Sequence, residues 1–155
     1  MSDGSEHIID AQRDLFLYEA MHSPVPHVLH DSCAHRDSAL RRLVRDGGME
    51  AYGRYWLLVE LLTGLPEHQY EVADEVGWEM FAADMSRLEA TSPDECKTFV
   101  GRLAELGLID REAYDEVHVV AIRRVLRDVE KYAQGTAKRK LGAWMRHNNV
   151  AAKKG

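Results

Sequence analysis

The chain has 155 residues, a length that suits one domain with a single core. Its 45% hydrophobic and 30% charged residues are typical of a soluble globular protein. Because the sequence has no apolar run of 18 residues and no basic-then-apolar leader, we expect a cytoplasmic protein without a membrane partner. The two cysteines, Cys33 and Cys96, are too few for a disulfide scaffold and are expected to be free thiols.

The net charge of −6 is spread unevenly along the chain. From residue 120 onward, ten lysines and arginines stand against two acidic residues, so this part carries +8 and residues 1–119 carry −14. Lys and Arg contacts to phosphates release counterions and supply most of the affinity for nucleic acid that does not depend on base sequence. The basic C-terminal part therefore indicates either a nucleic-acid contact or an ordinary solvated helix.

At the N-terminus, apolar residues between Ile8 and Met21 predict a short amphipathic helix. The segment Ser23-Pro24 ends it, since proline disfavours the helical conformation in the preceding residue. We interpret residues 1–24 as an extension outside the main core. Residues 25–30 are expected to be extended or a short strand.

Two successive helices are predicted between residues 37 and 64. Asp37 or Ser38 can cap the first helix, which ends at Gly47-Gly48. The second helix, about 49–63, is apolar on nearly all sides and belongs in the middle of a helix bundle. Gly53 is expected to mark a place where another helix approaches closely.

A second pair of helices follows a brief strand at 70–72. The spacing of apolar residues predicts a helix over about 74–89 and another over 93–106. Ser92 and Glu95 form a sequence pattern typical of a capping box, and Gly107 can end the helix.

The segments 108–110 and 117–119 resemble two short strands joined by residues 111–116, as in a small β-hairpin. A final helix is predicted from Val120 to about Trp144, weakened by glycines at 135 and 142. Two capped helices followed by a hairpin are the order of a winged helix-turn-helix. We therefore predict a mainly α fold with a winged-helix domain over 25–134 and a basic, partly helical tail over 135–155.

No catalytic or metal site stands out. His27, His30, Cys33 and His35 are residue types that bind zinc, but their spacing fits no common zinc finger, so we expect surface and capping residues. Cys96 lies on an apolar helix face, where a thiol behaves as a small hydrophobic group. The carboxylates are scattered, and no glycine-rich phosphate loop follows a strand. We expect a protein that is not an enzyme and carries no cofactor.

Nucleic-acid contacts have better candidates. Lys97, Thr98 and Arg102 would lie on the outward face of the second helix of the pair, where they can reach base edges or phosphates. The acidic residues of that helix, such as Asp94 and Glu105, oppose this role. Phosphate contacts are predicted for a further set of basic residues: Arg41, Arg42, Arg45, Arg111, Arg123, Arg124, Arg127, Lys138, Arg139 and Lys140.

Taken together, several short motifs resemble the N-terminal domain of phage replisome organisers and related primosomal proteins over roughly residues 27–132. The matching motifs are His30-Asp31, Asp37, the stretch from Gly48 through Tyr52, Gly53, Tyr55 and Trp56 to Glu60, and Gly107-Leu108-Ile109. The resemblance implies a winged helix that binds DNA during phage or plasmid replication initiation, without catalysis. It also implies replication proteins as partners.

Two other functions fit the same residues. The acidic balance of residues 1–119 favours a winged-helix adaptor or dimerisation module that does not bind DNA. A phage-type transcription regulator would share the DNA chemistry and differ in the sites it occupies. A homo-oligomer is compatible with each of these functions.

Overall fold

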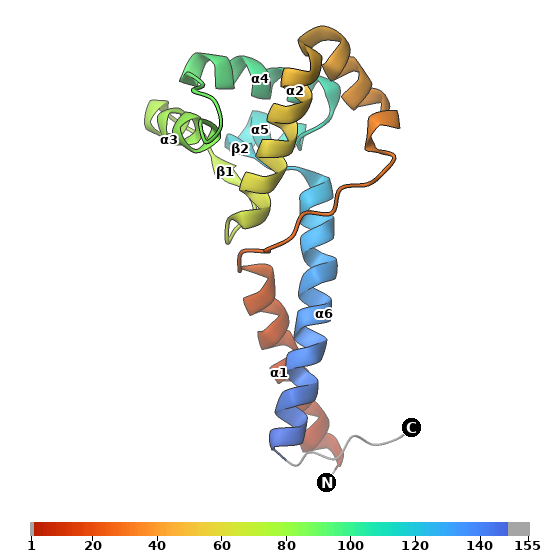
Figure 1. The fold of residues 1–155 in the computed structure, drawn as a ribbon. Helices are drawn as coiled ribbons and strands as arrows, with labels where there is room; N and C mark the ends of the chain where they lie inside the picture. Colours follow the sequence, from red (N-terminus) through yellow and green to blue (C-terminus); the bar gives the residue numbers. More distant parts are fainter. Residues whose placement is uncertain (1, 149–155) are drawn as a thin grey trace.

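The computed structural model describes residues 2–148, which form a globular head and a protruding stalk (Figure 1). The protein is mainly helical, as predicted, and its described residues form one small antiparallel sheet. In chain order the elements are α1 (Ser2–Met21), a 3₁₀ helix η1 (Ala34–Arg36), α2 (Ser38–Gly64), β1 (Tyr70–Glu71), α3 (Glu75–Met85), α4 (Pro93–Leu106), α5 (Arg111–Val117), β2 (Val119–Val120) and α6 (Arg123–His147). None of these helices combines the length and the apolar character that a membrane crossing requires.

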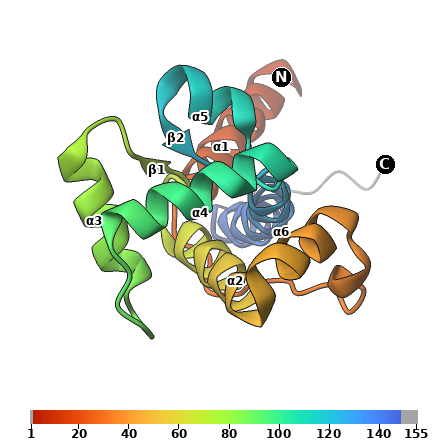
Figure 2. The same cartoon turned by 90° about the horizontal axis from the view of Figure 1, so that it is seen from above.

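Helix α2 is the central helix of the head and is kinked, which confirms the prediction of two successive helices. Asp37 caps it by accepting hydrogen bonds from the backbone amides of Ala39 and Leu40. At the kink, Gly48 has φ 70° and ψ −168°, a conformation that is essentially restricted to glycine. Beyond the kink, residues such as Leu58 and Leu62 are completely buried. In the view from above, α3 and α4 lie on one side of α2 (Figure 2).

The expectation for Gly53 is wrong. A Cβ atom at this position would meet nothing within 4 Å, so no helix approaches it. The close approach occurs at Gly77 in α3, where a Cβ atom would lie 3.0 Å from the backbone oxygen of Glu71 and 3.2 Å from the Cα of Val72. Gly77 therefore allows α3 to pack directly on the backbone around β1.

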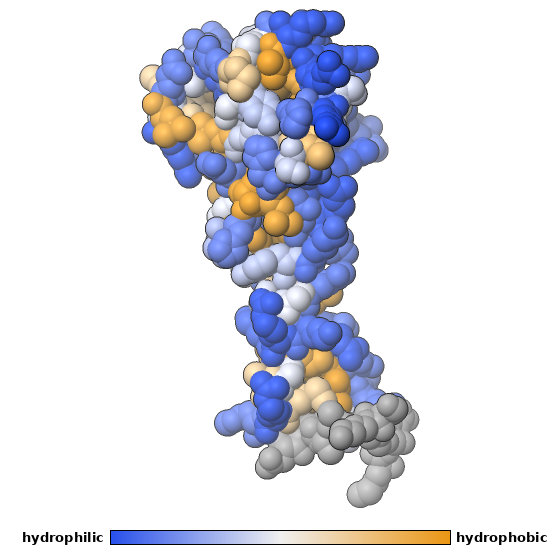
Figure 3. Space-filling view, turned by 45° about the vertical axis from the view of Figure 1, so that its right-hand side comes forward, coloured by the Kyte–Doolittle hydropathy of each residue, from blue (hydrophilic) through white to orange (hydrophobic). Residues whose placement is uncertain are grey.

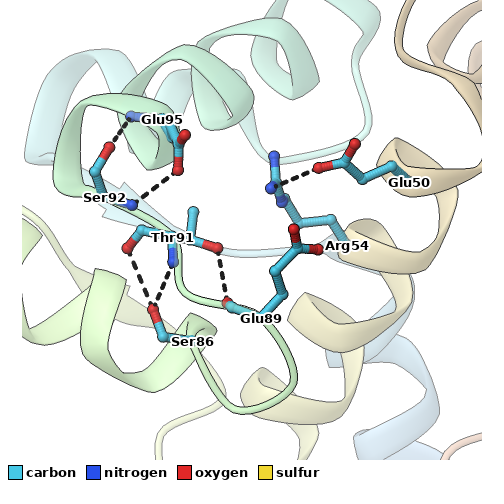
Figure 4. A network of polar contacts seen from close by, with 7 residues as sticks. All are labelled: Glu50, Arg54, Ser86, Glu89, Thr91, Ser92 and Glu95. Carbon is cyan, nitrogen blue, oxygen red and sulfur yellow. Dashed lines mark hydrogen bonds and ion pairs between the residues drawn. The ribbon is translucent and has the colours of Figure 1, made fainter.

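The turn between α3 and α4 confirms the predicted capping (Figure 4). The side chain of Ser92 accepts from the amide of Glu95, and the side chain of Glu95 accepts from the amide of Ser92. The hydroxyl of Ser86 donates to the carbonyl of Ala82 and, at 3.2 Å, to that of Thr91. Gly107, with φ 72°, ends α4 in the left-handed conformation. These contacts fix the ends of α3 and α4 at the turn that joins them.

The sheet differs from the predicted hairpin. Residues 111–117 form helix α5, so they do not join two adjacent strands, and the sheet instead pairs β1 with β2, Tyr70 opposite Val120 and Glu71 opposite Val119. The helix forms because the side chain of Asp110 caps it at the amide of Ala113. A single hydrogen bond from the amide of Asp110 to the carbonyl of Ala121, 2.8 Å long, brings the segment before α5 beside the end of β2.

The stalk consists of α1 packed along the distal half of α6 (Figure 1). Ala20, Ala133 and Ala137 are buried between the two helices, and these small side chains let them approach closely. Helix α6 continues through both glycines to His147, so the expected boundary between residues 134 and 135 falls inside a helix. Residues 149–155 of the predicted tail lie outside the described residues.

Candidate nucleic-acid interface

A cleft of the head, about 950 Å³ in volume, is lined by five arginines. It lies between the start of α6, the connection from α4 to α5, and the segment 29–37. We call it the arginine cleft, and its charged lining residues are Arg36, Arg111, Arg123, Arg124, Arg127, Asp31, Asp37 and Asp128. With His30 neutral, these side chains give the cleft a net charge of +2 in a protein whose total charge is −6.

Helix α6 opens into this cleft with an unusual N-terminus. Ile122 is its cap residue and supplies no side-chain hydrogen bond, so the first amides of the helix are not capped by a side chain. The first turn contains Arg123 and Arg124 and no acidic residue. Cations are disfavoured at this positive end of the helix dipole, by about 0.3–1 kcal/mol each at exposed positions. A bound anion would offset this penalty, because the start of a helix whose amides no side chain caps favours negative charge, as do the two arginines.

The aspartates of the cleft are already engaged, which leaves the arginines to dominate its chemistry. The carboxylate of Asp31 accepts from the amide of Cys33, and that of Asp37 caps α2. Asp128 lies between two arginines, 3.8 Å from the Nε of Arg124 and 3.9 Å from that of Arg127. Each carboxylate therefore has a local partner, and none has to be paired by an incoming ligand.

Arg124 differs from the other arginines of the cleft because its guanidinium contacts other parts of the protein. Its Nη2 donates to the carbonyl of Leu29 at 3.1 Å, and its guanidinium lies 5.2 Å from the ring centre of Trp56. His30 stacks on the same tryptophan, with ring centres 3.7 Å apart. We infer that Arg124 ties α6 to the segment 29–30 and to α2. The other four arginines of the cleft are therefore the ones that can bind a ligand.

Two of those arginines are extended into solvent even though each lies near a carboxylate. The side chain of Arg123 is 76% exposed and its Nε lies 3.6 Å from Asp110. The side chain of Arg111 is 68% exposed and its Nε lies 3.4 Å from Asp115. Exposed ion pairs of this length contribute little and are readily exchanged for a stronger partner. A phosphate group, which accepts two parallel hydrogen bonds from one guanidinium, is such a partner.

The residues predicted to read bases from α4 are engaged within the protein. Arg102 forms ion pairs with Asp46 of α2 and with Glu105. The Nζ of Lys97 lies 5.9 Å from the ring centre of Trp78. The hydroxyl of Thr98 donates to the carbonyl of Asp94 at 3.0 Å. The outward face of α4 is thus held by internal contacts, and it does not form a cluster with the arginine cleft.

The remaining predicted site residues lie in two other places. Arg41, Arg42 and Arg45 are exposed on the first half of α2, and two of them line a separate, mostly apolar pocket of about 370 Å³ with Met49 and Tyr52. Lys138, Arg139 and Lys140 are exposed on the stalk. Lys138 is 11 positions beyond Arg127, which is about 16 Å along a helix. Of the thirteen predicted residues, the cleft unites Arg111, Arg123, Arg124 and Arg127.

Arg36 completes the cleft and was not among the predicted site residues. It belongs to the basic group Arg36, Arg41, Arg42 and Arg45 in the sequence, but Arg36 lies in the 3₁₀ helix η1 and lines the cleft beside α6, whereas the other three lie in α2. The run of arginines in the sequence could have indicated Arg36 as a candidate site residue. Only the tertiary fold distinguishes Arg36 from its neighbours.

The cysteines and histidines form no second site. In residues 4–148 no group of three or more His, Cys, Asp or Glu side chains is arranged to hold a metal ion. His30 is occupied by the stack on Trp56 and by a contact of 3.4 Å to the hydroxyl of Tyr52. Cys96 is buried, and burial raises the pKa of its thiol, which keeps it protonated and unreactive.

Comparison of the chain with protein-family models, with curated proteins and with solved structures finds no match. The fold and the site define the protein as a mainly α protein with a two-stranded antiparallel sheet and an arginine-lined cleft.

Proposed function

We propose that the protein binds nucleic acid by its phosphate backbone through the arginine cleft and does not catalyse a reaction. The observation that carries the proposal is the convergence of Arg36, Arg111, Arg123 and Arg127 around one cleft, from three elements, η1, α5 and α6, that the fold of the head brings together. Guanidinium groups match the geometry of phosphate oxygens, and several such contacts supply most of the affinity.

We further propose that the head is a winged helix of the replisome-organiser type, acting in replication initiation. The order of α2, β1, α3, α4 and β2 supports the proposal, with α5 in the place of the predicted wing turn. The motif resemblance over residues 27–132 supports the assignment to replication. The internal contacts of Arg102 and Lys97 favour contacts to the backbone over base reading by α4.

The experiment measures the affinity of the full chain for fluorescent duplex and single-stranded oligonucleotides over a range of salt concentrations. For duplex DNA, the combined change Arg111→Gln, Arg123→Gln and Arg127→Gln should reduce the slope of log affinity against log salt by about 2.7. The control removes the same charge from the stalk by Lys138→Gln, Arg139→Gln and Lys140→Gln, and we expect a much smaller change in slope. Equal effects of both triple variants would contradict binding in the cleft.

An adaptor function is the second candidate, because apolar side chains of α3 and of the turn after it are exposed on the head. Val76 and Met80 on α3 are 61% and 59% exposed, and Leu88 in the turn after α3 is 87% exposed. Such side chains suit a protein partner. Undetectable nucleic-acid binding at low salt would leave the adaptor function as the better explanation of the fold.

A further inference from the structure

Helix α1 has two apolar faces, and only one of them is covered. Phe16 and Ala20 are on the face that packs on α6. The other face exposes large apolar side chains, with Ile8 58%, Leu15 48% and Tyr18 63% exposed. Together with the exposed Ala11, these residues follow a spacing of three and four residues, the repeat by which helices pack side by side. We call this set, Ile8, Ala11, Leu15 and Tyr18, the outer stripe.

The outer stripe lies on a part of the molecule that has no core of its own. Among the described residues, the main hydrophobic core contains no residue of α1, and from α6 it includes only Val125 and Val129 near the head. When two helices pack only on each other, each helix covers one face of its partner. The opposite face of each helix stays in solvent. Figure 3 shows hydrophobic surface on the stalk both just below the head and near its far end.

The two helices of the stalk carry opposite charge, and they do not neutralise each other. Between residues 4 and 21, α1 has four acidic side chains and one arginine, and Arg13 is already paired with Asp10. From residue 131 to 147, α6 has five basic side chains and no acidic one. In the described residues no ion pair joins α1 to α6, although the Nζ of Lys140 lies 6.0 Å from the ring centre of Phe16 in α1. Asp14 and Glu19, both exposed, flank the outer stripe.

We propose that the outer stripe is a dimer interface and that its occupant is the stalk of a second copy of this chain. A twofold axis would place the acidic α1 of each copy beside the basic part of α6 of the other copy. The same pairing of an acidic with a basic helix therefore occurs twice in the dimer. The same contact buries the outer stripe in a four-helix bundle. A second copy suits this surface because it carries the same apolar stripe, an acidic helix to pair with α6 and a basic helix to pair with α1. The inference is independent of nucleic-acid binding.

The test is sedimentation equilibrium of the full chain over a broad range of protein concentrations. We expect a reversible monomer–dimer equilibrium. The double variant Leu15→Glu and Tyr18→Glu should weaken the dimer by about tenfold or more, because it places charges in the centre of the interface. Both side chains are exposed in the monomer, so the circular-dichroism spectrum should be unchanged. The matched control, Val76→Glu and Met80→Glu, replaces two equally exposed apolar side chains on the head and should leave the dimer intact.

A charge exchange tests the proposed arrangement separately from the apolar contact. Asp14→Lys with Glu19→Lys should weaken the dimer at low salt, and adding Lys138→Glu with Lys140→Glu should restore it. A monomer at every concentration, or a dimer that survives the Leu15→Glu and Tyr18→Glu changes, would overturn the proposal. Failure of the second charge pair to restore the dimer would overturn the pairing of α1 with α6 of the other copy.

Discussion

Arg102 of α4 and Asp46 of α2 form an ion pair between residues 56 positions apart in the sequence. The same guanidinium donates to Glu105 at 3.0 Å. The pair lies beside the kink of α2 at Gly48, so it fastens the first part of α2 to α4. It also changes the charge that α4 presents, since a positive side chain of the predicted base-reading face is matched by two carboxylates.

The first prediction concerns the titration of Asp46. Hydrogen bonds from Arg45 and, next, Arg102 lower the pKa of its carboxyl below the ordinary value. Because the pKa is lower in the folded protein than in the unfolded chain, the ion pair stabilises the fold above the unfolded pKa. That contribution is lost as the pH falls through the folded pKa. In a carboxyl NMR titration, Arg102→Gln should move the Asp46 pKa back toward its ordinary value, and an unchanged titration would argue against the ion pair.

The second prediction separates the two candidate nucleic-acid surfaces. Arg102→Gln should lower affinity and salt slope only slightly, because its guanidinium is already matched by Asp46 and Glu105. Arg127→Gln removes the same charge from a side chain that is 64% exposed at the cleft, and it should reduce the slope for duplex DNA by about 0.9. Fluorescence anisotropy at several salt concentrations measures both. A larger loss of affinity with Arg102→Gln than with Arg127→Gln would indicate that α4 makes the main contact with DNA.

The third prediction uses two glycines of the same helix. Gly48→Ala should destabilise the fold by about 1–3 kcal/mol, because an alanine is strained at φ 70° and ψ −168°. Gly53→Ala, in an ordinary helical position with open space around its Cβ, should stabilise it by about 0.5–1 kcal/mol. Urea denaturation measures the free energy of unfolding of each variant. Equal effects of the two substitutions would show that the kink at Gly48 is absent in solution.

The fourth prediction concerns the capping box of α4. Ser92→Ala removes the acceptor for the amide of Glu95 and should cost about 1 kcal/mol of folding free energy. Thr98→Ala is the control, because the hydroxyl of Thr98 donates to a carbonyl of its own helix and leaves no amide without a partner when it is removed. Thermal unfolding followed by circular dichroism compares the two. Alanine has a higher helix propensity than threonine, so a loss of stability with Thr98→Ala as large as that with Ser92→Ala would contradict a specific contribution of the cap.

Elements with local causes could be predicted from the sequence. Asp37 and Ser92 cap α2 and α4 as expected, and Gly107 ends α4 with a positive φ. Each of these contacts joins residues within about one helical turn, so residue type and spacing suffice to predict it. Residues 111–117 are the exception: alternation suggested strands on either side of a turn, whereas the Asp110 cap favours a helix. A segment this short carries too little periodicity to decide between the two.

The candidate site, too, could be predicted from the sequence only in part. Arg111, Arg123, Arg124 and Arg127 were predicted as basic residues suited to phosphate, but nothing in their spacing shows that they share a cleft with Arg36. Nor does the sequence distinguish Arg124, bound to Leu29 and Trp56, from the exposed Arg123 beside it. These differences depend on which distant residue each side chain meets.

By itself, the sequence determined the helical character of the protein, the kink at Gly48, the capped helix pair and the concentration of positive charge near the C-terminus. Those features depend on backbone conformation and on hydrogen bonds between near neighbours. Only the tertiary structure decided the pairing of β1 with β2, the arginine cleft, the engagement of Arg102 by Asp46 and the exposed outer stripe of α1. Each of these requires two segments far apart in the chain to pack together, and packing depends on the shape of the whole core.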